Sequence, residues 1–184
     1  MDSDPRQHGF SLVEQVATLA VAAILIAMAV PSMARLVSRT ATRGVEDALF
    51  DAAHLARQHA VMQASSVLLC PSRDGRACDD EGHWRDGWIV AADVDRDGRP
   101  DDTVLARGTP PLDRVVVLGN RGRPRVRFQP DGSASGSNIT LLACPRRAAD
   151  GTARRVVISN AGRIREAAAN AEQQARCAAT VENK

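Results

Sequence analysis

The sequence predicts an α+β fold, in which one long N-terminal helix packs on a globular domain of antiparallel β-sheets. An apolar run near the N-terminus continues into helically spaced small residues as far as residue 62. From residue 65 onward, short β-like runs alternate with turns rich in Gly, Asp, Pro and Asn. Many short strands with short connections favour antiparallel sheets over βαβ units. We therefore expect a membrane-length helix over residues 10–31, its amphipathic continuation over 32–63, and a β-rich domain with a C-terminal tail over 64–184.

The N-terminal apolar run is long enough to cross a membrane. Residues 1–9 are short and polar, whereas the next 21 residues, Phe10 to Val30, are apolar apart from Ser11, Glu14, Gln15 and Thr18. About 20 apolar residues span a bilayer at a rise of about 1.5 Å per residue. Pro31 then removes a backbone donor, so we expect a kink or a break in the helix near Val30.

Glu14 is the one acidic residue in this apolar run. A charge inside a membrane-spanning helix costs about 2.5–3.5 kcal/mol on insertion scales, so a lone carboxylate there indicates a partner and a function. A plain signal anchor is the simpler interpretation of the segment, but it leaves Glu14 without a role.

The segment after Pro31 has the pattern of an amphipathic helix. Its apolar residues are mostly small and recur at helical spacing, which suits close packing on a sheet; they are Val45, Ala48, Leu49, Ala52, Leu55 and Ala56. Charged residues occupy much of the remaining surface: Arg35, Arg39, Arg43, Glu46, Asp47, Asp51 and Arg57.

The β-rich part divides at its turn residues into eight expected strands. They lie near Val67–Cys70, Gly87–Ala92, Thr103–Ala106, Arg114–Leu118, Arg125–Gln129, Asn138–Cys144, Arg154–Ser159 and Arg163–Glu166. The tail, residues 167–184, is rich in alanine and glutamine and is either helical or loosely ordered.

The chain has four cysteines: Cys70, Cys78, Cys144 and Cys177. They form no C-x-x-C pair, and their spacing to histidine does not match a zinc site. Beyond a membrane anchor the chain would face an oxidising space, where disulfides persist. Pairing of nearest neighbours would join Cys70 to Cys78 and Cys144 to Cys177, but two other connectivities and free thiols stay open.

The charges are segregated along the chain. Residues 74–113 hold eleven acids and five arginines, whereas residues 121–165 hold ten arginines and two acids. Such an asymmetry concerns partners rather than fold. The basic half suits a polyanion, because the guanidinium fork binds phosphate bidentately and phosphate contacts provide most of the sequence-independent affinity for DNA.

Strand alternation sharpens this expectation. Arg123, Arg125 and Arg127 would share one strand face, with Val126 and Phe128 on the other. Arg163 and Arg165 would likewise point together. Charge clustering alone adds four further candidates: Arg146, Arg147, Arg154 and Arg155. A solvated basic strand, paired with the chain's own acids or with a neighbour, is the simpler interpretation of all of them.

The acidic turn at Asp93–Asp102 begins like a calcium loop, but Val104 stands where an EF-hand requires glutamate. We therefore favour an Asp-rich turn and expect no metal and no cofactor. The chain also lacks the G-x-S-x-G, P-loop and H-E-x-x-H motifs. We expect no enzymatic activity.

The run Gly9-Phe10-Ser11-Leu12-Val13-Glu14 resembles the class III signal of type IV pilins and type II secretion pseudopilins. The resemblance implies that residues 1–9 are a leader peptide, which a prepilin peptidase removes after Gly9, and that the new N-terminus at Phe10 is methylated. It also implies a use for Glu14, which would pair with the freed amine of Phe10 in a neighbouring subunit. The fold implied is that of the type IV pilins.

Later motifs narrow the resemblance to the FimT/GspH family. They are Cys70-Pro71, Gly87-Trp88-Ile89-Val90, the acidic turn, and Phe128-Gln129-Pro130-Asp131-Gly132. The run Gly162-Arg163-Ile164-Arg165 also resembles the GRxR element with which FimT minor pilins contact DNA during natural transformation. By that resemblance Gly162, Arg163 and Arg165 are candidate DNA-binding residues.

The resemblance implies a minor pilin that binds extracellular double-stranded DNA for uptake, independently of sequence. Its partners would be other pilins, the prepilin peptidase and, before assembly, the bacterial inner membrane, which the precursor crosses once. In the pilus it would be periplasmic or extracellular. The alternative is a structural pseudopilin of type II secretion, or a minor pilin that primes assembly, with no role in DNA binding.

Overall fold

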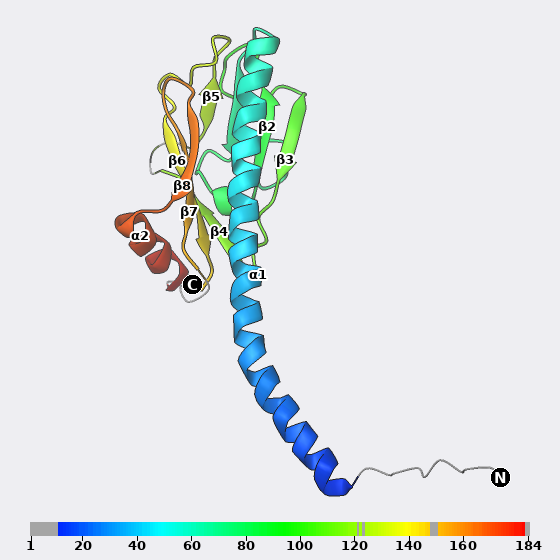
Figure 1. Cartoon of the computed structure of the whole chain (residues 1–184). Helices are drawn as coiled ribbons and strands as arrows, with labels where there is room; N and C mark the ends of the chain where they lie inside the picture. The colour runs from blue at the N-terminus through cyan, green and yellow to red at the C-terminus, as the bar shows by residue number, and fades with distance from the viewer. Residues whose placement is uncertain (1–10, 121, 123, 148–150, 183–184) are drawn as a thin grey trace, which may run out of the picture.

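In the computed structural model, which describes residues 11–120, 122, 124–147 and 151–182, one long helix lies against two β-sheets (Figure 1). The helices are α1 (Leu12–Met62), the short 3₁₀ helix η1 (Trp84–Asp86) and α2 (Ala171–Glu182). The strands are β1 (Val67–Pro71), β2 (Trp88–Ala92), β3 (Val104–Gly108), β4 (Val115–Leu118), β5 (Val126–Phe128), β6 (Ile139–Pro145), β7 (Arg154–Ile158) and β8 (Ile164–Ala168).

Helix α1 is continuous over 51 residues. It begins where the Ser11 hydroxyl accepts a hydrogen bond from the Val13 amide at 3.2 Å. We expected a kink or a break near Val30; the helix passes through Pro31 without a break, so that part of the expectation is wrong. A proline in a helix removes only one backbone bond, and the bonds on either side keep the ladder together. Figure 1 shows α1 bending in its N-terminal half, below the domain.

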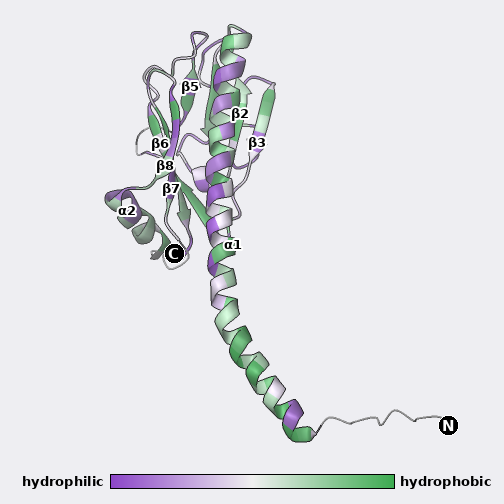
Figure 2. Cartoon of the chain, in the orientation of Figure 1, coloured by the Kyte–Doolittle hydropathy of each residue, from purple (hydrophilic) through white to green (hydrophobic). Residues whose placement is uncertain are grey.

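The N-terminal half of α1 packs against no other described part of the chain. Its large apolar residues are exposed as far as Val37, and Ser38 is the first buried residue of the helix. Figure 2 shows this half as a nearly continuous hydrophobic surface. By length and composition it can cross a membrane.

The two sheets are antiparallel throughout, as predicted. One has the strand order β3-β2-β1-β5 and the other the order β4-β6-β7-β8. In the second sheet Val157 pairs with Arg165 and Ile158 with Ile164, which fixes the register of the β7–β8 hairpin. The C-terminal half of α1 packs against strands of both sheets.

The core forms where small residues of α1 meet these sheets. Ala53, Ala56 and Ala60 are fully buried, which lets the helix backbone approach the strands closely. The expected apolar face is partly wrong, because Ala48 and Leu55 are exposed. Glu46, expected on the charged surface, is instead 2% exposed.

All eight expected strands are present, with ends shifted by one or two residues. The shifts follow the pairing: β3 continues to Gly108 because Gly108 pairs with Trp88. In the described part of the tail, Ala167 and Ala168 end β8, and Ala171–Glu182 form the helix α2. The disulfides join nearest neighbours, Cys70 to Cys78 and Cys144 to Cys177, and the second bond holds α2 on the outer face of the second sheet.

Candidate nucleic-acid interface

The turn between β7 and β8 presents the Gly162–Arg165 motif. The Ser159 amide donates to the Arg163 carbonyl at 3.0 Å, and the Gly162 amide donates to the Ser159 carbonyl at 2.8 Å. Gly162 has φ +70°, the left-handed conformation that glycine adopts at no steric cost in such hairpin loops. The local sequence therefore specifies a tight turn with an arginine directly after it.

The hairpin tip is locked to the loop between β5 and β6. A Cβ on Gly162 would lie 1.8 Å from the Gly132 carbonyl oxygen, so only glycine fits there. The Asn160 carbonyl accepts from the Ala134 amide at 2.8 Å, and the Asn160 side chain accepts from the Asn138 amide at 3.2 Å. These contacts hold the tip in one position.

Helix α1 reaches the same junction through Arg57, whose Nε donates to the Gly132 carbonyl at 2.9 Å. Because Arg57 lies in the last turns of α1, the hairpin tip is at the end of the domain opposite the apolar half of the helix (Figure 1). The sequence placed Arg57 only on a charged helix surface. The contact could not be predicted from the sequence, because Arg57 lies 75 residues before Gly132.

Arg163 and Arg165 are both exposed beyond this tip. Between them Ile164 packs against the core, so alternation along β8 turns both guanidinium groups to the outer face. Neither forms an ion pair with any residue that the structure describes. Two like charges therefore lie together without a counter-ion from the protein.

Arg155 is on the same outer face, because it pairs with Ala167, two residues beyond Arg165 on β8. Diagonal neighbours on a sheet lie about 7–8 Å apart, within reach of long side chains. Its Nη1 donates to the Gln173 side chain of α2 at 3.2 Å, a neutral partner that leaves the charge unbalanced. Arg155 thus adds a third cation to this face of the β7–β8 hairpin, diagonal to Arg165.

Arg154 faces the opposite way. Its Nε lies 2.5 Å from the Glu46 carboxylate, which is buried on α1, so this arginine neutralises an internal charge. Glu166 of β8 lies nearby. Burial, and then the charges of Glu46 and Asp47, raise the pKa of the Glu166 carboxyl.

Arg127 lies on β5 in the other sheet, Arg125 directly precedes that strand, and both contact the acidic turn. The Arg127 Nε lies 2.8 Å from the carboxylate of fully buried Asp93, an ion pair without hydrogen-bond alignment. Arg125 pairs with Asp80 and also donates to the Gly98 carbonyl. Both cations are therefore occupied within the chain.

The acidic turn directs its carboxylates largely at its own backbone. The side chains of Asp93, Asp95 and Asp97 converge so that a metal could reach all three. However, Arg127 already balances Asp93, and the Asp97 side chain accepts from the Arg99 amide at 2.7 Å. The Arg127 guanidinium thus supplies the positive charge that a calcium ion would otherwise bring to Asp93.

Arg146 and Arg147 follow β6 at the other end of the second sheet. The Arg146 amide donates to the Arg114 carbonyl at 2.7 Å. The candidate arginines therefore do not share one face. They form a group at the hairpin (Arg155, Arg163 and Arg165), a pair at the base of the domain (Arg146 and Arg147), and three residues that are ion-paired within the chain (Arg125, Arg127 and Arg154).

The other predicted residues concern assembly. Glu14 is exposed in the first turn of α1. Its pairing with a neighbouring subunit stays a prediction. Gly9, Phe10, the leader over residues 1–9, and Arg123 lie outside the described residues.

Comparisons with known proteins agree with this fold. A family model described as type II transport protein GspH matches residues 47–162, and one described as prokaryotic N-terminal methylation motif matches residues 4–30. Together with the apolar half of α1, the methylation motif fits a membrane-anchored precursor of a pilus component. None of the curated proteins compared with the chain matches it.

Solved structures share the architecture at low sequence identity. The type IV minor pilin FimU of Pseudomonas aeruginosa superimposes with a TM-score of 0.56 at 18% identity, over 72% of this chain and 95% of that one. The minor pseudopilin EpsH of the Vibrio cholerae type 2 secretion system gives a TM-score of 0.50 at 14% identity, over 69% and 96% of the two chains. The predicted pilin-like fold is confirmed. The fold is therefore the one found in a minor pilin and a minor pseudopilin.

Proposed function

The chain belongs to the GspH family, and from that membership we propose that it is a minor pilin that binds double-stranded DNA for uptake through the β7–β8 hairpin. It would assemble with other pilins through α1, after a prepilin peptidase cleaves the leader and the new N-terminus is methylated. Glu14 would then pair with the free amine of a neighbour, which offsets the cost of burying both charges.

One observation carries the DNA-binding proposal. Arg163 and Arg165 are exposed together on a locked hairpin and have no acidic partner among the described residues. Because the hairpin backbone is fixed and the guanidinium fork is planar, less conformational entropy is lost when the two arginines bind a phosphate. Arg155 would add a third contact. Arg125, Arg127 and Arg154 are left out of the proposal, because acids of the same chain neutralise them.

Duplex DNA is the form of nucleic acid that this surface suits best. The chain has three Phe, two Trp and no Tyr, and both tryptophans are buried. Platforms for single strands depend on exposed aromatic rings that stack on bases. The hairpin offers cations instead, and cations bind the phosphate backbone regardless of sequence.

The direct test is a titration of fluorescent duplex DNA with the full chain in neutral detergent. Replacing Arg163 and Arg165 with alanine should weaken binding at least about tenfold, since each hydrogen bond to a charged group contributes about 1.5–3 kcal/mol. The Arg146→Ala/Arg147→Ala pair removes the same charge elsewhere and should bind nearly as well as the wild type. An equal weakening in both variants would mean that DNA affinity depends on net charge alone and not on the hairpin.

The family model supports a second candidate function, because the family is described as type II transport protein GspH. In that case the chain is a structural pseudopilin, or a minor pilin that primes assembly, and the hairpin arginines contact another subunit. Wild-type protein that fails to bind DNA even at low salt would favour this second function.

A further inference from the structure

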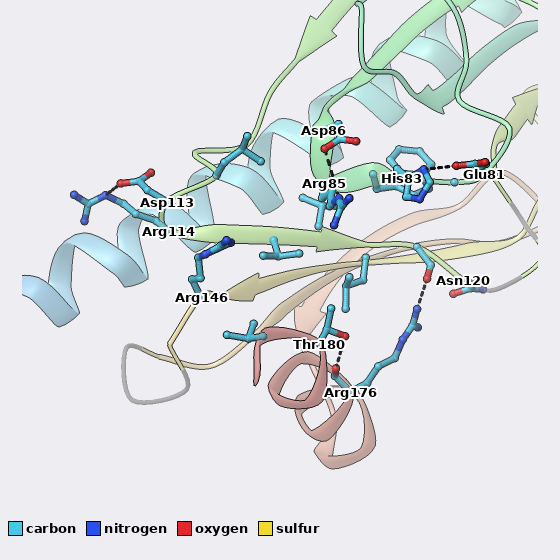
Figure 3. Close-up of a pocket in the computed structure, with 18 of the residues that line it drawn as sticks. Glu81, His83, Arg85, Asp86, Asp113, Arg114, Asn120, Arg146, Arg176 and Thr180 are labelled. Carbon is cyan, nitrogen blue, oxygen red and sulfur yellow. Dashed lines mark hydrogen bonds and ion pairs between the residues drawn. The ribbon is translucent and has the colours of Figure 1, made fainter. Parts of the chain in front are cut away.

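A groove of about 1190 Å³ opens at the base of the globular domain. Its walls come from parts of the chain that are far apart in sequence: Ala34 of α1, Arg85 of η1, Leu118 of β4, Arg146 beyond β6, and Val181 of α2. Figure 3 shows Arg146 lying along β4, with η1 on one side and α2 on the other. The hairpin arginines are not part of it.

The groove lies where the helix would leave a membrane. A hydrocarbon core about 30 Å thick takes up about 20 helical residues, so a span that begins at Leu12 ends close to Pro31. Ala34, which lines the groove, then lies about 5 Å farther along the axis, at the depth of the lipid headgroups. The exposed apolar side chains of Met33 and Leu36 agree with this depth.

The charges of the groove are unbalanced towards the positive. Each of the four acids that line it is in an ion pair: Asp80 with Arg125, Glu81 and Asp86 with Arg73, and Asp113 with Arg114. Within the described residues, Arg146, Arg147 and Arg176 have no acidic partner. Leu112, Val116 and Val181 give the same groove an apolar lining.

We propose that this groove binds the headgroup of an anionic phospholipid while α1 anchors the chain in a membrane. The lipid phosphate lies against Arg146 and Arg147, whose forks suit it geometrically. The first methylenes of the acyl chains cover the apolar lining. A basic pocket at the membrane surface is the arrangement that recognises anionic headgroups. Lipid binding would orient the domain on the membrane and would end when the subunit enters a filament.

An acidic peptide of a neighbouring subunit could meet the same arginines. The position of the groove favours the lipid, because an anchored chain keeps the groove at headgroup depth. This inference rests on anchoring by α1 and not on DNA binding, so the two proposals can fail separately.

Native mass spectrometry of the full chain in neutral detergent tests the proposal, with phosphatidylglycerol or phosphatidylcholine of identical acyl chains added. We expect the wild type to retain phosphatidylglycerol preferentially. Each arginine near a membrane surface contributes about fivefold to binding, so Arg146→Gln/Arg147→Gln should lower retention about tenfold or more. Arg163→Gln/Arg165→Gln removes the same charge at the other end of the domain and should retain as much lipid as the wild type.

Three results would overturn the proposal. They are equal retention of the two lipids by the wild type, undiminished retention by the groove variant, and an equal reduction in the hairpin variant. If the groove variant keeps its lipid but co-purifies with fewer filament subunits, the groove is a protein-docking surface instead. Circular dichroism of each variant, compared with the wild type, separates loss of the site from loss of the fold.

Discussion

Gly162 lies so close to Gly132 that a Cβ on Gly162 would be 1.8 Å from the Gly132 carbonyl oxygen. The same oxygen accepts a hydrogen bond from Arg57. One carbonyl thus joins the end of α1, the β5–β6 loop and the tip of the β7–β8 hairpin. Gly162 therefore has a structural role in its motif, whereas Arg163 and Arg165 are exposed and available to bind a ligand.

Gly162→Ala should destabilise the chain by more than about 2 kcal/mol, because a left-handed φ costs a side chain about 1–2 kcal/mol and the overlap with Gly132 adds to this. Gly136→Ala is the matched control: Gly136 has φ +73°, and a Cβ there meets no atom within 4 Å. Gly136→Ala should destabilise the chain only by the cost of the left-handed φ, about 1–2 kcal/mol. Thermal unfolding measures both, and equal destabilisation would contradict the close approach of Gly162 to Gly132.

Arg154→Ala should cost about 3 kcal/mol, because it leaves the buried Glu46 carboxylate without its partner. The figure is at the low end of the range for buried pairs, since the Arg154 side chain is 31% exposed. Arg155→Ala, one residue along on the opposite face, should cost less than about 1 kcal/mol. Chemical denaturation distinguishes the two, and a larger destabilisation at Arg155 would reverse the assignment of faces.

Glu166→Gln should stabilise the chain slightly at neutral pH. Partial burial and the charges of Glu46, Asp47 and Asp51 on α1 raise the pKa of Glu166 in the folded state, and the charge of Arg154 opposes part of this rise. Ionised Glu166 therefore opposes folding once the pH exceeds its unfolded pKa, and fully so above its folded pKa. The difference in melting temperature should disappear below about pH 4, where glutamate is protonated in both states. A pH-independent difference would exclude titration as its cause.

Calcium should not change the melting temperature of the wild type, because Arg127 already balances Asp93 in the acidic turn. Arg127→Ala leaves the convergent carboxylates of Asp93, Asp95 and Asp97 without that cation. This variant should be less stable than the wild type in a chelator and should recover part of the difference in millimolar calcium. Stabilisation of the wild type by calcium would show instead that the turn is a metal site.

Local sequence patterns determine much of this fold. The apolar spacing specified α1, turn residues divided the chain into eight strands, and alternation turned Arg163 and Arg165 to one side with Ile164 on the other. The disulfides join nearest neighbours, which is one of the connectivities that the sequence left open. The helix, the strands and the alternation each depend on residues close together in the chain, whereas the Cys144–Cys177 bond joins residues 33 positions apart.

The features that could not be predicted depend on distant partners. Glu46, which neutralises Arg154, lies 108 residues earlier, on α1. The clustering of arginines in the sequence therefore wrongly indicated that Arg154 is free to bind a polyanion. Alternation put Arg125 and Arg127 on one face correctly, but it carried no information that Asp80 and Asp93 would cover them. Glu46 occupies a polar position in the helix pattern and is buried only because β7 supplies its counter-ion.

The salt dependence of DNA binding tests the hairpin proposal most directly, because it reports how many phosphates the protein neutralises. Removing one arginine that binds a phosphate should reduce the slope of log affinity against log salt by about 0.9. For the full chain, we predict that Arg163→Ala/Arg165→Ala lowers this slope by about two, whereas Arg146→Ala/Arg147→Ala leaves it unchanged. An unchanged slope in the hairpin variant would contradict the proposal that Arg163 and Arg165 contact the DNA backbone.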